Sequence, residues 1–253
     1  MKFENIRVSN FENAIRGMRN PLNSWDKSDS KFGFEFNEVD SLSAKLESYD
    51  NWSIIHKDNG IVEYAALGPK DIDLAQRLIK GGSEHRKFLR QIQVSVDITA
   101  PLFWFKEFDT YKIGTVANST STMHTLLNHP ITLDCFEIND FISIGFPKEL
   151  QREDTKSFCD EDFIQMCLIP YLEFLRQLTK ELKEKQDVNW KIVWKELVRW
   201  LPESWLQTRT ITLNYENLYT MCRQRKGHKL VEWKYFIDFV STLPYANELI
   251  FVD

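Results

Sequence analysis

The sequence predicts an α+β fold in a single domain that spans residues 1–253. Short segments in which apolar and polar residues alternate, such as KFGFEFN at 31–37, indicate half-buried strands. Longer segments with apolar residues three and four positions apart, such as 69–80, indicate amphipathic helices. No internal repeat, low-complexity linker or shift in composition divides the chain. Strands and helices are therefore expected to share one domain.

The N-terminal part contains several local signals for strands, turns and helix ends. Asn10 is a candidate helix cap, Pro69 fits a first helical turn, and Gly81-Gly82 is a stop signal. An AspAsnGly sequence ending at Gly60 favours a hairpin turn. The elements expected from these signals are a strand over 2–8, a helix over 11–18, a polar loop over 19–30, a strand over 31–37, a helix over 41–49, strands over 52–55 and 61–66, a helix over 69–80 and a strand over 88–98.

The C-terminal part is expected to be richer in helix. An aromatic-rich helix should begin at Pro101, and Pro170 should kink the longest helix of the chain. The apolar stripe of that long helix is predicted to be Tyr171, Phe174, Leu175, Leu178 and Leu182. The expected elements are a loop-rich segment over 128–158, helices over 160–186 and 189–200, a strand over 205–213, a helix from Tyr215 to near Gly227 and a helix over 230–243.

Composition and missing motifs exclude several classes of function. The net charge is −5 and the pI is about 5.7, whereas a general nucleic-acid binder is expected to be basic. The chain has nine Gly and neither GxGxxG nor GxxxxGK[ST], so the common dinucleotide and phosphate loops are missing. No HExxH, CxxC or GxSxG occurs, so no metal site is predicted and no catalytic residue can be assigned.

The four Cys residues are scattered without a CxxC pair, as is typical of reduced thiols in a cytosolic protein. The N-terminal segment has no apolar region of the kind found in signal peptides. No apolar run reaches the about 18 residues that a membrane-spanning helix needs. We therefore expect a cytoplasmic protein with no membrane partner.

The chemically most suggestive stretch runs from Asp97 to His124. Its aromatic first half should be buried, and polar side chains crowd together between Asp109 and His124, around Gly114. Hydroxyl, amide and cationic groups of this kind bind anionic, hydroxylated ligands. The alternative interpretation is a polar loop followed by a Ser/Thr-rich helix start, in which hydroxyl groups cap the backbone.

A second cluster, RQRKGHK at 223–229, is rich in cations although the chain is acidic overall. Guanidinium groups match phosphate oxygens with two parallel hydrogen bonds, which favours a phosphate clamp. The alternative is a solvated helix end whose cations complement the negative end of the helix dipole.

Two regions, about 70–125 and 197–236, resemble flavin-dependent thymidylate synthases. The helix ending in Gly, the Glu-His pair and the strand that follows correspond to LIKGGSEHRKF here. The family motif RHRxxSxNExSxRY falls on 111–124, where Asn118 and Ser121 match. Leu201-Pro202, Asn214 with Leu218, and Arg225 with His228 and Glu232 are similar to the family's LP…TxNxRxL…LR…HAQxE segment.

The resemblance implies a largely antiparallel sheet flanked by helices, in a homotetramer that methylates dUMP with FAD and a folate. It implies a nucleotide site and a flavin site between subunits, with no nucleic-acid partner. The residues expected to bind the nucleotide are Lys112, Ser119, Ser121, Arg209 and Arg225. The residues expected to bind the cofactor are Glu84, His85, Asn118, His124, Asn214 and His228.

The family's Arg-His-Arg triplet and the Arg-Tyr pair that ends its motif are missing from this chain. In the family the triplet helps to hold flavin and nucleotide, so we expect at most weak FAD binding and low or absent turnover. The sequence is best described as a divergent, phage-type member of the superfamily. Two alternatives remain: a non-catalytic protein that binds or sequesters a nucleotide on the same fold, and a structural or interaction protein without a small ligand.

Overall fold

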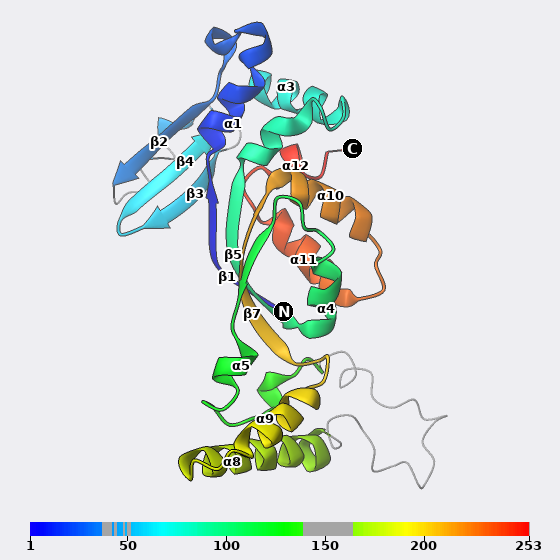
Figure 1. Ribbon diagram of the computed structural model, residues 1–253. Helices are drawn as coiled ribbons and strands as arrows, with labels where there is room; N and C mark the ends of the chain where they lie inside the picture. The colour runs from blue at the N-terminus through cyan, green and yellow to red at the C-terminus, as the bar shows by residue number, and fades with distance from the viewer. Residues whose placement is uncertain (37–41, 43–44, 48, 50–51, 139–163, 253) are drawn as a thin grey trace. The chain divides into compact units, whose positions relative to one another are not determined.

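The computed structural model describes residues 1–36, 42, 45–47, 49, 52–138 and 164–252, and its chain forms two compact units. Unit 1 comprises Met1–Ile98, Thr110–Asn118 and Thr210–Asp253, and unit 2 comprises Thr99–Asp109 and Ser119–Arg209. Strands β5 (Gln93–Pro101) and β7 (Leu206–Asn214) each continue from one unit into the other (Figure 1). The sequence predicted a single domain, which requires that the two units fold together. This stays a prediction.

A four-stranded sheet has the order β1-β5-β7-β6, where β1 is Lys2–Ser9 and β6 is Val116–Ser119. Hydrogen bonds join Ser95 to Thr212 (3.0 Å) and Thr210 to Asp97 (2.5 Å). Moving two residues forward along β5 therefore moves two residues backward along β7, which defines an antiparallel pair. The intervening residues of β5 point into the core, and they are Val94, Val96 and Ile98.

A second sheet belongs to unit 1 and has the order β2-β4-β3, with both pairs antiparallel. Its strands are Lys31–Phe36, Ile61–Ala66 and Ser53–Asp58. The AspAsnGly turn joins β3 to β4 as predicted, with Asn59 and Gly60 at positive φ. Four of the nine residues of the helix predicted over 41–49 lie outside the described residues, and Leu42 and Lys45 of the remaining five are helical.

Helices cover the sheets of unit 1, and most of them begin and end near the predicted residues. Phe3 of β1 stacks on Phe239 with ring centres 4.3 Å apart, which packs α11 against the sheet. The strand predicted from residue 88 begins only at Gln93, because Arg86–Gln91 forms a 3₁₀ helix. The helices of unit 1 are α1 (Phe11–Met18), α3 (Pro69–Lys80), α10 (Tyr215–Arg225), α11 (Val231–Ser241) and α12 (Ala246–Leu249).

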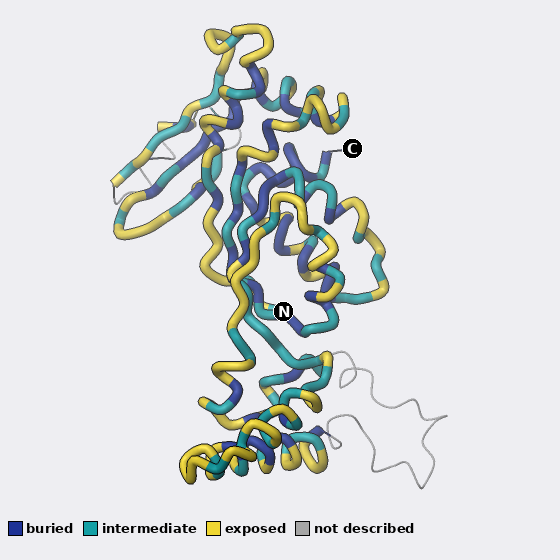
Figure 2. The backbone as a smooth tube through the Cα atoms, viewed as in Figure 1, coloured by how far each residue is buried: buried dark blue, intermediate teal, exposed yellow. Residues whose placement is uncertain are grey.

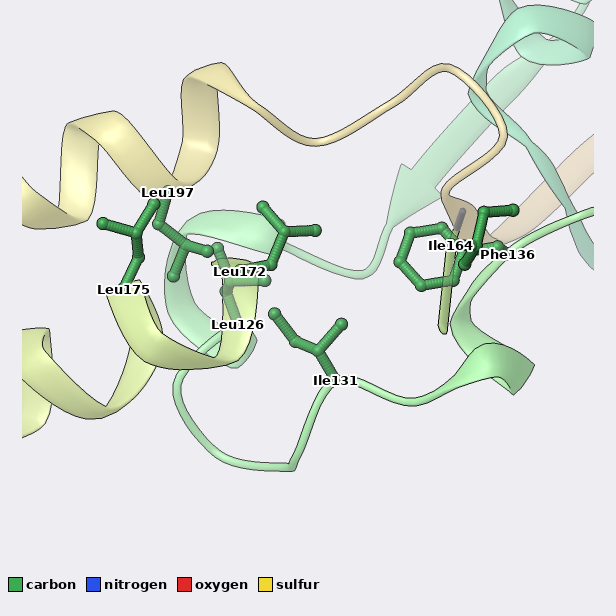
Figure 3. Packing of buried hydrophobic residues seen from close by; sticks show 7 residues of the cluster. All are labelled: Leu126, Ile131, Phe136, Ile164, Leu172, Leu175 and Leu197. Atoms are coloured by element: carbon green, nitrogen blue, oxygen red, sulfur yellow. The ribbon is translucent and has the colours of Figure 1, made fainter. Parts of the chain in front are cut away.

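Unit 2 contains one apolar cluster, to which α8 (Ile169–Glu184) and α9 (Trp190–Arg199) contribute together with the loops that adjoin them (Figure 3). The buried members of this cluster come from segments on both sides of the region 139–163, and Leu172 and Leu197 are fully buried. The helices are α4 (Leu102–Phe108), α5 (Thr122–Thr125), α8 (Ile169–Glu184) and α9 (Trp190–Arg199), and a π-helical turn, Ile164–Leu168, precedes α8. The remaining cluster members are Leu126, Ile131, Phe136, Ile164 and Leu175.

The predicted apolar stripe of α8 is wrong in part, because Leu175 is buried as expected but Tyr171 and Phe174 are exposed. Tyr171 and Phe174 are 41 % and 59 % exposed, whereas Leu172 is fully buried. Arg176 is also buried, because Glu173 accepts two hydrogen bonds from its guanidinium group at 2.7 and 2.5 Å. Sequence periodicity places Arg176 in solvent, but its pairing with Glu173 allows it to be buried. The buried face of α8 therefore differs from the predicted one. Pro170 lies in the first turn of α8, directly after the π-helical turn Ile164–Leu168, and the kink predicted there stays a prediction.

Figure 2 shows that burial differs between the strands of the four-stranded sheet, since β5 alternates between half-buried and buried residues and β6 is exposed. In the aromatic run, Trp104 and Phe105 are fully buried and Phe108 is 2 % exposed, as predicted. In contrast, the segment from Lys112 to Thr120 is almost entirely exposed. The polar segment singled out in the sequence is therefore a surface feature that adjoins a buried anchor.

Candidate functional site

The polar segment of unit 1, residues 110–118, is fastened to the start of helix α10. Asn217 Nδ2 donates a hydrogen bond to the carbonyl of Ile113 at 2.8 Å. Gly114 has a φ of +76°, and a Cβ atom there would lie 3.0 Å from side-chain atoms of Asn214 and Asn217. Gly is therefore required both for the backbone conformation and for the close approach to α10.

Asn214 itself caps helix α10. Its side chain accepts a hydrogen bond from Asn217 N at 3.0 Å, and Asn217 Oδ1 accepts one from Asn214 N at 3.1 Å. This reciprocal pair satisfies two backbone donors at the helix start. The sequence resemblance assigned Asn214 to cofactor binding, and the structure gives it a structural task at the same place.

The other end of α10 carries the central cation of the site, Arg225. Its Nε donates to Tyr111 Oη at 3.0 Å, and Tyr111 Oη donates to Gln224 Oε1 at 3.0 Å. The guanidinium carbon lies 5.5 Å from the centre of the Tyr111 ring and 4.7 Å from that of Trp233. Two aromatic faces thus hold the guanidinium group through cation–π attraction. We call Tyr111, Gln224, Arg225, His228 and Trp233 the Arg225 cluster.

His228 joins this cluster from the turn between α10 and α11. Its Nδ1 accepts a hydrogen bond from Leu230 N at 3.1 Å, and its ring centre lies 6.3 Å from that of Trp233. Because Nδ1 accepts, the ring proton of neutral His228 belongs to Nε2. Trp233 is fully buried, so the cluster has a rigid apolar floor beneath its polar groups.

Lys112 is exposed and directly follows Tyr111, a member of the Arg225 cluster, in the fastened segment. Asn118, expected at the cofactor site, is exposed at the end of the same segment. The structure therefore brings together residues about 110 positions apart in the chain, from the two regions that carry the family resemblance. Lys112, Arg225 and His228 are the predicted site residues that lie in or beside the cluster.

Glu84 and His85 lie in an exposed turn after α3, elsewhere in unit 1. The neighbouring Arg86 forms an ion pair with Glu216 of α10 at 3.2 Å, and Arg90 contacts the same carboxylate. Sequence analysis assigned no role to this ion-pair group. It connects the Glu-His turn to the first turn of α10, and thus to the helix that carries Arg225.

The remaining predicted site residues, Arg209, Ser119, Ser121 and His124, belong to unit 2. Arg209 Nη1 donates to Asp109 Oδ1 at 2.7 Å, and its guanidinium carbon lies 3.9 Å from the centre of the Phe105 ring. The charge of Arg209 is therefore paired within this unit.

Ser121 precedes α5, and its carbonyl accepts hydrogen bonds from the amides of His124 and Thr125. Ser119 and His124 are exposed. A short helix thus begins directly after Ser121, as the helix-start interpretation expects, but the Ser121 hydroxyl makes no capping hydrogen bond, so that part of the interpretation is wrong.

The structure describes three site features that sequence analysis missed: the pairing of Tyr111 with Arg225, the aromatic floor of Trp233, and Gln224 as acceptor. Among the described residues, no group of three or more His, Cys, Asp or Glu side chains could hold a metal ion. Within the same part of the chain, no helix is long and apolar enough to cross a membrane.

Comparison with known proteins identifies the fold. No family model and no curated protein sequence matches the chain. Among solved structures, a flavin-dependent thymidylate synthase ThyX from Helicobacter pylori, complexed with FAD and dUMP, superposes with a TM-score of 0.57. It has 18 % sequence identity, and the match covers 99 % of this chain and 98 % of that one. A second structure of H. pylori ThyX with FAD and dUMP gives a TM-score of 0.56 at 15 % identity, over 98 % and 97 % of the two chains.

These matches define an α+β protein with largely antiparallel sheets flanked by helices, which confirms the predicted fold class. More particularly, the chain has the fold of the flavin-dependent thymidylate synthases over nearly its whole length.

Proposed function

We propose that this protein is a divergent, phage-type relative of the flavin-dependent thymidylate synthases that binds a pyrimidine nucleotide of the dUMP type. The observation that carries the proposal is the Arg225 cluster, where two aromatic rings contact the guanidinium group and exposed Lys112 follows Tyr111 in the chain. A phosphate group pairs with the cations, and aromatic and amide groups suit a base. In this proposal the protein is a cytoplasmic homotetramer, and the nucleotide contacts within unit 1 come from Arg225 and Lys112.

The donors around the cluster fit one phosphate group better than they fit FAD. Within residues 108–118, Lys112 is the only cation where the family has its Arg-His-Arg triplet. Asn214 is engaged as a helix cap, and Arg209 is paired with Asp109. FAD would supply redox chemistry, but it needs several fixed donors along its pyrophosphate and ring system. We therefore assign no reaction step to a flavin, and a non-catalytic nucleotide-binding or sequestering protein is the alternative function.

The first test replaces Arg225 with Gln and measures dUMP binding by calorimetry. Loss of one charge-assisted contact corresponds to about 1.5–3 kcal/mol, so the affinity should fall about tenfold or more. The matched control is Lys226→Gln, which removes the adjacent charge outside the Arg225 cluster and should leave dUMP affinity within about twofold. If Arg225→Gln instead unfolds the protein with no selective loss of affinity, the cations at 223–229 only stabilise the helix end.

A second test asks whether chemistry survives. Release of tritium from 5-labelled dUMP is measured with FAD, NADPH and methylenetetrahydrofolate, and flavin absorbance is recorded on the same preparation. We expect a colourless protein that binds dUMP and releases little or no tritium, because the donors that position a flavin are missing. Robust release of tritium would exclude the non-catalytic, sequestering alternative. If dUMP does not bind at all, the remaining interpretation is a structural or interaction protein.

A further inference from the structure

The cations of RQRKGHK at 223–229 face two different places on unit 1. Arg225 and His228 belong to the Arg225 cluster, but Arg223 and Lys226 line a separate cavity of about 450 Å³. The other residues around this cavity come from α10, from α11 and from the segment after α12: Cys222, Ile237, Ile250, Phe251 and Val252. The proposed nucleotide site makes no use of this cavity.

The walls of the cavity are apolar. Ile250 and Val252 are buried at 1 % and 6 % exposure, and Phe251 and Ile237 are half-buried. Burial raises the pKa of the Cys222 thiol to about 12, so that this side chain is neutral and presents an apolar surface. A cavity of this volume lies within the range of small-molecule sites, which combine apolar walls with few polar groups.

The polar groups of the cavity are both cationic, and none of its lining residues is acidic. Arg223 is fixed in place, because its Nη2 donates to the carbonyl of Val252 at 2.7 Å and its guanidinium carbon lies 4.6 Å from the centre of the Tyr219 ring. Lys226 is exposed at the end of α10, and no acidic partner for it occurs among the described residues. Cations at a helix end complement the helix dipole, but this does not explain why they border an apolar cavity.

From these observations we propose that the cavity between α10, α11 and the segment 250–252 is a second binding site, for a small carboxylate with an apolar body. The carboxylate pairs with Lys226 and Arg223, and the apolar body lies against Ile237, Ile250 and Phe251. In a chain of net charge −5, a pair of cations with no acidic group among the described lining residues attracts anions to this point of the surface. The site is independent of the proposed nucleotide site, since it lies on other residues of α10.

The experiment uses octanoate as the probe and 1-octanol as its uncharged counterpart, both titrated by calorimetry into the full-length chain. Octanoate should bind with one site per chain, and octanol should bind about tenfold or more weakly because it lacks the charge-assisted contact. Lys226→Gln should weaken octanoate about tenfold without affecting thermal stability, since Lys226 is exposed. Ile237→Trp should abolish binding by filling the cavity.

Arg225→Gln serves as the control that separates the two sites. It should leave octanoate affinity unchanged while it weakens dUMP, and Lys226→Gln should do the reverse. The proposal is overturned if octanoate fails to bind at millimolar concentration, or if octanoate and octanol bind equally and Lys226→Gln affects neither. A failure of dUMP to bind would count against the nucleotide site alone.

Discussion

Replacing Asp71 with Asn should lower the free energy of unfolding by about 3–5 kcal/mol, because the change leaves Arg19 as an uncompensated buried charge. Asp71 is fully buried, and its Oδ1 accepts a hydrogen bond from Arg19 Nε at 2.6 Å. Its Oδ2 accepts from the hydroxyl groups of Ser28 at 2.6 Å and Ser30 at 2.7 Å. One carboxylate therefore fixes the loop over 19–30 to the first turn of α3.

Asp73→Asn provides the matched control for this prediction. Asp73 lies on the same helix, and its ion pair with Arg77 is exposed, with side chains 66 % and 68 % accessible. Exposed pairs of this kind contribute about 0–1 kcal/mol. Urea unfolding followed by tryptophan fluorescence compares the two variants. If both variants lost the same free energy of unfolding, the buried carboxylate of Asp71 would not be what fixes the loop over 19–30.

The same carboxylate makes the effect depend on pH. Burial alone would raise the pKa of Asp71, but hydrogen bonds from Ser28, Ser30 and Arg19 outweigh it and leave the pKa below its usual value. A lowered pKa means that the stabilisation is complete above the unfolded value of about 4 and is lost as the pH falls below it. The difference between wild type and Asp71→Asn should therefore shrink in acid, which unfolding curves between neutral pH and pH 3 would measure.

The Asp71 network also illustrates which features local sequence signals can predict. Pro69 and Gly81-Gly82 placed both ends of α3 correctly, because these residues act through their own backbone. The residues that satisfy the start of that helix come from elsewhere: Asp29 accepts from the amides of Lys70 and Asp71. A cap supplied from about 40 residues away leaves no periodic signal, so the segment 19–30 was predicted only as a polar loop.

At the candidate site, too, the sequence predicts which residue types occur but not which residues far apart in the chain come into contact. Sequence composition singled out the cations at 223–229, because such a cluster is unusual in an acidic chain, and Lys112 was singled out as part of the polar segment between Asp109 and His124. It could not indicate that Arg225 contacts Tyr111, or that Arg223 and Lys226 face a different cavity. These assignments depend on the rotation of α10 and on the path of residues 110–118, which the Gly114 contact with Asn214 and Asn217 fixes.

The buried face of α8 gives the second large prediction, because here the sequence pattern and the structure disagree. Of the stripe predicted for this helix, Tyr171, Phe174, Leu175, Leu178 and Leu182, only Leu175 is buried. The structure buries Leu172 and Arg176 instead, since Glu173 neutralises the guanidinium group that periodicity would place in solvent.

Leu172→Ala should therefore destabilise the protein by about 2–5 kcal/mol, through lost burial and the cavity that remains in the cluster of unit 2. Phe174→Ala removes a larger side chain that is 59 % exposed, and it should change stability by about 0.5 kcal/mol or less. Urea unfolding measures both changes, and hydrogen exchange of the α8 amides localises them. If Phe174→Ala proved the more costly, the stripe predicted from periodicity would be the buried one. The expected order of effects follows from the ion pair between Glu173 and Arg176, which makes the less apolar face of α8 the one that can be buried.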